Sequence, residues 1–186
     1  GITAKETTTM VPRRLADDGD TVYWSSVYSS CLGFWLGTGK PSTMGTCTAT
    51  DSDRSPGIAL DAAQVYWTVS LLSTCAAIPG CCGPGGTSCL VGAAKKGAAS
   101  TVIAGERGTI SDVVRVGEEL FFAAQASDTE GTIERCPAAL SACSPVVFEA
   151  GEDKHPPIRL AAAGGYVYWS TTAGFLRRKS LAAPEN

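Results

Sequence analysis

The 186-residue sequence has few charged side chains and no excess of positive charge. Charged residues make up 18% of the chain, below the roughly 25% that is usual in globular proteins. The 15 Lys and Arg residues are outnumbered by 18 Asp and Glu residues, so no basic field gathers phosphates. The apolar fraction of 44% is typical of a folded chain rather than a disordered one. We expect a globular protein that does not bind nucleic acid.

Long apolar helices are also lacking. The longest stretch without a charge, residues 62–94, contains Pro79, Pro84 and a Gly-rich run. These residues exclude a continuous apolar helix of about 20 residues, so we expect no membrane span. No signal peptide is visible, and the chain opens with Gly1 rather than Met. We expect it to have been processed or cut from a longer protein.

Recognisable catalytic motifs are missing as well. The single histidine, His155, lies in a polar Asp-Lys-His-Pro-Pro segment before a predicted strand, and we expect it to be an exposed loop residue. The sequence contains no Gly-x-Ser-x-Gly nucleophile motif and no phosphate-binding Gly-rich loop. We therefore predict no catalytic residue, no cofactor and no enzyme activity.

An internal repeat is the strongest positive signal. A short apolar strand, a turn and a second strand with a Val-Tyr-Trp or Leu-Phe-Phe centre occur four times, at intervals of 43, 55 and 47 residues. The aromatic residues that mark the repeats are Trp24, Trp67, Phe122 and Trp169. These intervals bracket the roughly 40–50 residues of a four-stranded propeller blade. β-branched and aromatic residues favour strands, and the Asp-Gly and Gly-Gly pairs favour hairpin turns.

Further strands are expected after each hairpin. Residues 131–136 and 174–181 alternate between apolar and polar, as in a strand with one buried face. Residues 100–104 and 145–150 read as outer strands. The sequence therefore predicts an all-β propeller of four four-stranded antiparallel blades, either a small closed ring or an open arc of a larger propeller.

The repeat resembles a known family. The run Leu60-Asp61 followed by Val-Tyr-Trp-Thr at 65–68, with a later Gly-x-Ile-x-Arg at 131–135, is similar to the YWTD-type repeat of low-density-lipoprotein-receptor-like proteins. Secreted proteins and lipoproteins of myxobacteria and their relatives are more similar still, because their Val-Tyr-Trp strand is followed by Arg-Cys-Pro, as at 135–137 here. The likeness covers residues 12–182. The receptor-type Asp after Tyr-Trp-Thr is absent, and there are four repeats where YWTD propellers usually have six.

One domain of four repeats accounts for the whole chain. The expected repeats span residues 12–55, 56–107, 108–155 and 156–186. Residues 1–11 include the strand-like run Thr-Thr-Thr-Met-Val, which we expect to complete the last blade and hide its edge. Under the alternative of an open arc, removing residues 1–11 would cost almost no stability.

Eight cysteines indicate an oxidising compartment, and we expect an extracellular, cell-surface or periplasmic protein. The repeats contain two, four, two and no cysteines, which favours pairing inside blades. All eight are expected to form structural disulfides: Cys31, Cys47, Cys75, Cys81, Cys82, Cys89, Cys136 and Cys143. For the segment 75–89, a zinc site and a vicinal Cys81–Cys82 bond remain alternatives to two structural bonds. Cys136 and Cys143 should staple one hairpin.

A few residues are candidates for binding. Asp17, Asp18 and Asp20 could donate oxygen ligands to Ca²⁺, although Asp in a turn mainly bonds its own backbone. Trp35 has no counterpart in the other repeats and is the candidate for an exposed ligand contact. The Tyr-Trp pairs are expected to pack in the core. No other metal site is predicted.

The function that follows is a non-catalytic extracellular or cell-surface binding or scaffold module. Its partner would be a protein or carbohydrate that meets loops at one end of the propeller. The alternative is a propeller hydrolase or lactonase with a carboxylate-held metal in the central channel. The residues expected at the inner strands, Ala, Arg, Leu and Val, do not favour that alternative.

Overall fold

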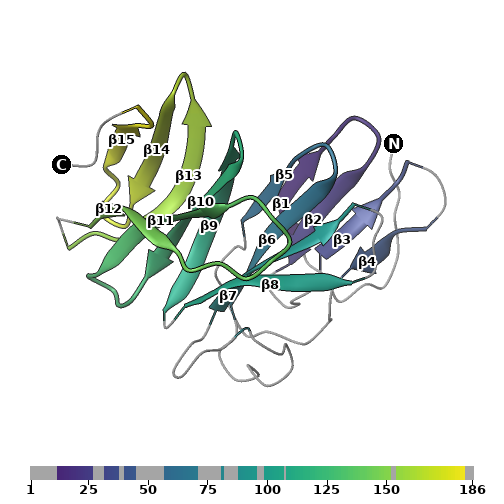
Figure 1. The fold of residues 1–186 in the computed structure, drawn as a ribbon, viewed down its shortest axis with the longest axis horizontal. Helices are drawn as coiled ribbons and strands as arrows, with labels where there is room; N and C mark the ends of the chain where they lie inside the picture. Colours follow the sequence, from purple (N-terminus) through teal and green to yellow (C-terminus); the bar gives the residue numbers. More distant parts are fainter. Residues whose placement is uncertain are drawn as a thin grey trace.

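The computed structural model describes residues 12–26, 32–37, 40–44, 57–70, 81, 88–95, 99–106, 108–151 and 154–182. These residues form β-strands in four antiparallel sheets, each built from consecutive strands (Figure 1). We call the sheets blades 1 to 4.

The blades follow one another along the chain. Blade 1 contains β1 (Pro12–Asp17), β2 (Val22–Ser26), β3 (Leu32–Trp35) and β4 (Ser42–Met44). Blade 2 contains β5 (Ile58–Leu60), β6 (Gln64–Ser70), β7 (Ser88–Ala94) and β8 (Ser100–Glu106). Blade 3 contains β9 (Thr109–Val116), β10 (Glu119–Gln125), β11 (Gly131–Pro137) and β12 (Val146–Ala150). Blade 4 contains β13 (Pro157–Ala163), β14 (Tyr166–Thr171) and β15 (Leu176–Ser180).

Tight turns join the first two strands of each blade. Between β13 and β14, Gly164 and Gly165 have φ angles of 59° and 81°. A two-residue hairpin turn of this kind needs positive φ at both central positions, which glycine adopts without a steric penalty. The Gly-Gly pair therefore fixes the register in which Ala163 pairs with Tyr166.

The second strand of each blade carries an aromatic pair that points to both faces. We call the face with Trp24, Trp67, Phe122 or Trp169 the leading face of its blade, and the opposite face the trailing face. Neighbouring strand residues point to opposite sides of a sheet, so Tyr23, Tyr66, Phe121 and Tyr168 lie on the trailing faces.

Each trailing face packs against the leading face of the next blade. Tyr23 of blade 1 shares a buried cluster with Trp67 of blade 2. In the same way, Tyr66 shares a cluster with Phe122, and Phe121 shares one with Trp169. The hydrophobic core is therefore divided into three layers between four blades.

The three junctions also carry ion pairs. Asp18 lies 2.6 Å from the Lys95 Nζ at the first junction, and Glu149 lies 3.0 Å from the Lys179 Nζ at the third. At the second, Asp61 lies 3.4 Å from the Arg115 Nε. In every case the acid belongs to the earlier blade and the base to the later one.

This arrangement confirms the prediction of an all-β four-bladed propeller. Three blades have four strands, and the described part of blade 4 has three. The proposed contribution of residues 1–11 to blade 4 lies outside the described residues. Within the described part of the chain, no helix is long and apolar enough to cross a membrane.

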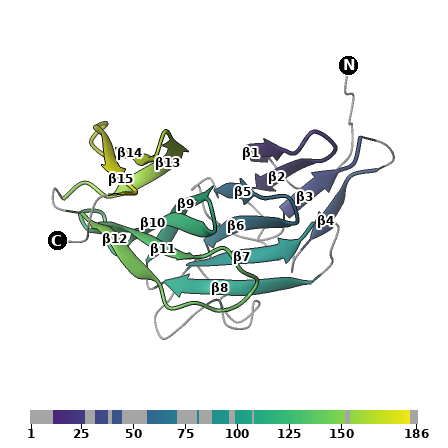
Figure 2. The ribbon, with the colours of Figure 1, turned by 45° about the horizontal axis from the view of Figure 1, so that its top comes forward.

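The blades form an arc with an open side between blade 4 and blade 1 (Figure 2). Inner strand β1 packs against β5, β5 against β9, and β9 against β13. In the described part of the chain, β1 and β13 are not among the element pairs that pack extensively. Blades 1 and 4 are therefore the two ends of the arc.

Two disulfides are present among the described residues. Cys136 bonds Cys143 and closes the connection between β11 and β12, as the sequence predicts. Cys81 bonds Cys89 at the start of β7, so Cys81 is not available for a vicinal bond to Cys82. The remaining cysteines lie outside the described residues: Cys31, Cys47, Cys75 and Cys82.

Removing the Cys136–Cys143 bond should destabilise blade 3. We expect the double variant Cys136→Ser and Cys143→Ser to lose about 2–3 kcal/mol of unfolding free energy, because the bond closes a short loop in the unfolded chain. The loop also touches blade 2, since the Cys143 N–H donates to the Ile103 carbonyl at 2.8 Å. Urea unfolding of both proteins measures the difference, and equal midpoints would contradict it.

Candidate functional site

Inner strands of three blades bring polar side chains to the propeller axis. Asp112 on β9 is 2% exposed, and its carboxylate accepts hydrogen bonds from the Leu160 N–H at 2.9 Å and the Val113 N–H at 3.0 Å. Arg14 of β1 forms an ion pair with the same carboxylate. One carboxylate thus joins blades 1, 3 and 4.

The blade 2 backbone also approaches Asp112 closely. A Cβ added to Gly57, just before β5, would collide with the Asp112 carboxylate and the Val113 N–H. Only glycine fits this approach, because any side chain would displace buried groups. Burial raises the pKa of Asp112 even though the positive charge of Arg14 opposes the shift. Burial likewise lowers the pKa of Arg159, helped by the nearby charge of Arg14.

Asp112 is a site residue that the sequence pattern does not predict. The inner-strand positions were expected to hold only Ala, Arg, Leu and Val, whereas β9 places Ser111 and Asp112 there. The Asp112 carboxylate is already engaged by one guanidinium and two backbone N–H groups. Among the residues that the structure describes, no three His, Cys, Asp or Glu side chains gather as a metal site would require.

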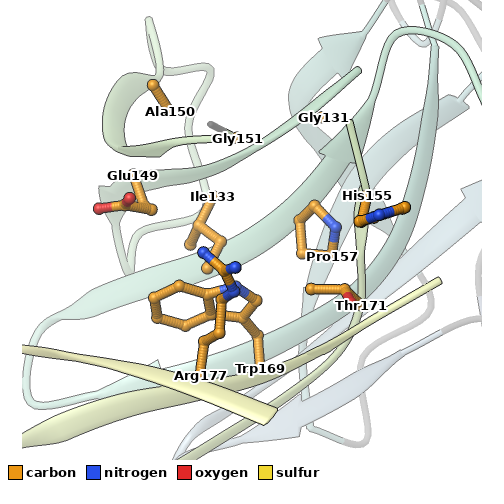
Figure 3. Close-up of a pocket in the computed structure, with 10 residues that line it drawn as sticks. All are labelled: Gly131, Ile133, Glu149, Ala150, Gly151, His155, Pro157, Trp169, Thr171 and Arg177. Atoms are coloured by element: carbon orange, nitrogen blue, oxygen red, sulfur yellow. The ribbon is translucent and has the colours of Figure 1, made fainter. Parts of the chain in front are cut away.

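A pocket lies between blades 3 and 4 (Figure 3). It is shallow, with a cavity volume of about 20 Å³, and it opens to solvent. The side chains of Ile133 and Trp169, both buried, form apolar walls. Polar side chains from four segments complete the lining: Glu149, His155, Thr171 and Arg177.

The pocket combines an apolar surface with both signs of charge. Arg177 extends from β15 over the Trp169 ring in Figure 3, and Glu149 lies across the opening. His155 is exposed, as expected for a loop residue, and its ring lies 5.9 Å from that of Phe175. A few polar groups around an apolar surface are typical of a ligand pocket. Sequence patterns do not indicate this pocket, because its lining residues lie far apart along the chain.

The acidic turn in blade 1 makes local hydrogen bonds. The Asp18 Oδ1 accepts from the Thr21 N–H at 2.8 Å and the Asp20 N–H at 3.2 Å, while the Asp17 Oδ1 accepts from the Gly19 N–H at 3.3 Å. The Lys95 ammonium, which donates to Asp18, holds the pKa of that carboxyl below its usual value.

The calcium prediction for Asp17, Asp18 and Asp20 has a direct test. If these carboxylates hold Ca²⁺, its addition should raise the melting temperature and a chelator should reverse the rise. Because the Asp18 carboxylate already bonds Lys95 and two N–H groups, we expect no shift in either direction. Differential scanning calorimetry measures this, and replacing all three residues with Asn provides the control.

One aromatic pair lies where two blades pack, whereas the tryptophans of blade 1 lie on its leading face. Tyr66 and Trp67 are both buried, at 0% and 2% exposure, which confirms core packing for this pair. Trp35 is half-buried on β3 and pairs with Val22, which places it on the leading face of blade 1. Trp24 lies on that face too, against Gly33, where an added Cβ would collide with the indole.

The Tyr66 hydroxyl should ionise at an unusually high pH. Burial, followed by the charge of Asp61, raises the pKa of Tyr66 to about 12. The hydroxyl has one proton to donate, and two acceptors lie within its reach: the Asp61 carboxylate at 3.3 Å and the Gln64 side-chain oxygen. Because the folded-state pKa lies above the unfolded value of about 10, this tyrosine contributes stability that is lost as the pH rises from 10 to 12.

Alkaline titration tests this expectation. Absorbance at 295 nm should show fewer phenolates forming near pH 10 than in the unfolded chain, since burial raises the pKa of Tyr23 as well. The Tyr66→Phe variant should remove one tyrosine from the late phase. A titration curve unchanged by Tyr66→Phe would contradict the assignment.

Comparisons with known proteins agree on the fold. No protein-family model matches the sequence, and no curated protein matches it. The computationally designed Ika4 protein has a TM-score of 0.63 at 11% identity, and the match covers 94% of each chain. A chain of a nidogen–laminin complex has a TM-score of 0.56 at 16% identity, covering 93% of this chain and 77% of that one.

The virginiamycin B lyase of Staphylococcus aureus has a TM-score of 0.52 at 13% identity. The match covers 91% of this chain but only 55% of the lyase, so the chain spans about half the length of that protein. At these identities the likeness concerns the fold alone. The chain is thus similar to solved β-propellers, one of them designed, and shares their architecture.

Proposed function

We propose that the chain is a non-catalytic binding module that holds a protein partner through the pocket between blades 3 and 4. The observation that carries the proposal is the lining of this pocket, where buried Trp169 meets exposed Arg177 and His155. A partner surface could cover this shallow opening and form charged hydrogen bonds with the polar side chains at its mouth. One solved structure with this fold is that of a nidogen–laminin complex.

The proposed location is outside the cytoplasm. The Cys81–Cys89 and Cys136–Cys143 disulfides support it, since such bonds persist in oxidising compartments. The Val-Tyr-Trp and Arg-Cys-Pro motifs support a YWTD-like repeat of the kind found in secreted propellers and lipoproteins of myxobacteria.

The absence of catalysis is part of the proposal. A hydrolase of the propeller type would need free carboxylates on the axis to hold its metal. The axial Asp112 instead has its oxygens engaged by Arg14 and by backbone N–H groups of blades 3 and 4. This arrangement supports a structural role for the axial carboxylate.

Binding to arrays tests the proposal. The full chain would be probed against secreted-protein ectodomains and, separately, against glycans. We expect ectodomain binding that weakens at least tenfold in the double variant Arg177→Ala and His155→Ala. Arg13→Ala, which removes an exposed arginine from blade 1, is the matched control and should bind as the wild type does.

Two results would overturn the proposal. Ectodomain binding that is indifferent to both pocket substitutions would move the site elsewhere, and binding to glycans alone would change the class of ligand. Hydrolysis of esters or lactones that stops when a chelator is added would show that the chain is an enzyme.

A further inference from the structure

Among the residues that the structure describes, each end blade leaves one face without a neighbouring blade. Along β10 in blade 3, six consecutive residues are buried, because blades cover both of its faces. Along β14 in blade 4, buried and half-buried residues alternate strictly. Blade 1 alternates in the same way, with Tyr23 buried and Trp24 half-buried. The described part of the arc thus presents one open leading face and one open trailing face.

The open leading face of blade 1 is apolar. Leu15 pairs with Trp24 and is 69% exposed, although its counterparts Val113 and Leu160 are 1% and 8% exposed. Trp35 lies on the same face by register. This face therefore carries aromatic and aliphatic residues like those that pack at the three internal junctions.

The open trailing face of blade 4 is its counterpart. Tyr166 and Tyr168 are half-buried there, with ring centroids 6.1 Å apart. Leu176, which pairs with Ser170 on this face, is 76% exposed. The guanidinium of Arg178 lies 4.7 Å from the centre of the Tyr166 ring.

The two open faces carry opposite charges. The acid and the base stand on the opposite faces from those that carry them at the internal junctions. Counted from the aromatic anchors, Asp17 occupies the position that Arg115 occupies in blade 3, and Ala163 occupies that of Asp61. Arg115 and Asp61 form the ion pair of the second junction. At a fourth junction the acid would come from the leading face and the base, Arg178, from the trailing face.

We propose that two copies of this chain assemble head to tail, each placing the leading face of its blade 1 on the trailing face of blade 4 of the other. Every internal junction joins one face of each kind, and the chain offers one more of each. A two-fold axis makes both contacts at once and closes a ring.

Apolar contacts should hold the ring together. The exposed leucines would enter a layer like the three internal ones, where equivalent side chains are buried. We expect Leu15→Asp or Leu176→Asp to weaken association at least 100-fold, because either change would bury an unpaired charge. Val147→Asp is the matched control: Val147 is 52% exposed but lies on outer strand β12, away from both open faces.

Charge reversal tests the register of the contact. We expect Asp17→Arg and Arg178→Asp each to weaken association, since each puts like charges together, and the double variant to recover most of the loss. Restoration by the double variant is a result that mere misfolding could not produce. Circular dichroism and melting curves of all variants check that the chain remains folded.

Sedimentation equilibrium across micromolar concentrations gives the decisive readout. The expected species has twice the 19.1 kDa mass of the chain and dissociates in the leucine variants but not in Val147→Asp. A folded monomer at every concentration would overturn the proposal, as would larger open assemblies. A dimer that is indifferent to the leucine and charge substitutions would place the interface elsewhere and would overturn it too.

Discussion

Replacing Asp112 with alanine is expected to lower the free energy of unfolding by about 2–5 kcal/mol, because it removes a buried carboxylate from a part-buried ion pair and from two backbone N–H groups. The change leaves the Leu160 and Val113 N–H groups without the acceptor that they bond at 2.9 and 3.0 Å. Buried donors without partners add about 1–3 kcal/mol each when no water replaces the acceptor. Arg14 would lose its counter-charge as well.

Chemical denaturation measures this loss. Asp20→Ala is the control, because Asp20 is an exposed turn carboxylate and its removal should change stability by less than about 0.5 kcal/mol. If Asp112→Ala unfolds at the wild-type urea concentration, the axial cluster does not join the blades.

The pH dependence of the free energy of unfolding distinguishes the effect of the Asp112 charge from that of its hydrogen bonds. The folded-state pKa of Asp112 is raised above its ordinary value of 3.8, so the folded chain binds the proton more tightly than the unfolded chain does. The contribution of this group to stability therefore grows as the pH falls from 7 through its folded pKa. We expect the free energy of unfolding of the wild type to increase relative to that of Asp112→Asn as the pH is lowered from 7. A difference that is constant between pH 7 and 4 would contradict this.

Trp67→Ala should be the most damaging change among the aromatic anchors. Trp67 is 2% exposed and packs with Tyr23 across the first junction. Removing so large a buried side chain costs about 3–5 kcal/mol, because the cavity closes only in part. The measurement is urea unfolding followed by circular dichroism.

Trp24→Ala is its matched control. It occupies the same position in blade 1 but is only half-buried there, so we expect less than half of the Trp67 loss when the chain is dilute and monomeric. Equal losses in the two variants would mean that the leading face of blade 1 is covered in solution at those concentrations.

The sequence predicted the blades because their signals are local. The aromatic pairs recur at blade spacing, and each hairpin has its own turn residues, such as Gly164 and Gly165. Cys136 and Cys143 are separated by seven positions and are the two cysteines of their repeat. Their pairing could therefore be inferred from the number of cysteines in each repeat.

The axial cluster and the pocket could not be predicted in this way. Asp112 lies within an otherwise apolar strand, and its partners Arg14 and Leu160 are 98 and 48 positions away. The pocket joins Ile133 to Arg177 through the stacking of two blades. Such groupings depend on how the blades are arranged around the axis, and a repeat pattern carries no information about that.

The ion pair across the axis has a consequence for folding cooperativity. In a stack whose units contact only their neighbours, each unit can open almost independently, and the end units fray first. Asp112 connects β9 to both β1 and β13, so the two end blades share one buried anchor. Opening either end exposes the same carboxylate, which couples their local unfolding. Amide protons of β1 and β13 should therefore exchange at similar rates in the wild type, and at unequal rates once Asp112 is replaced.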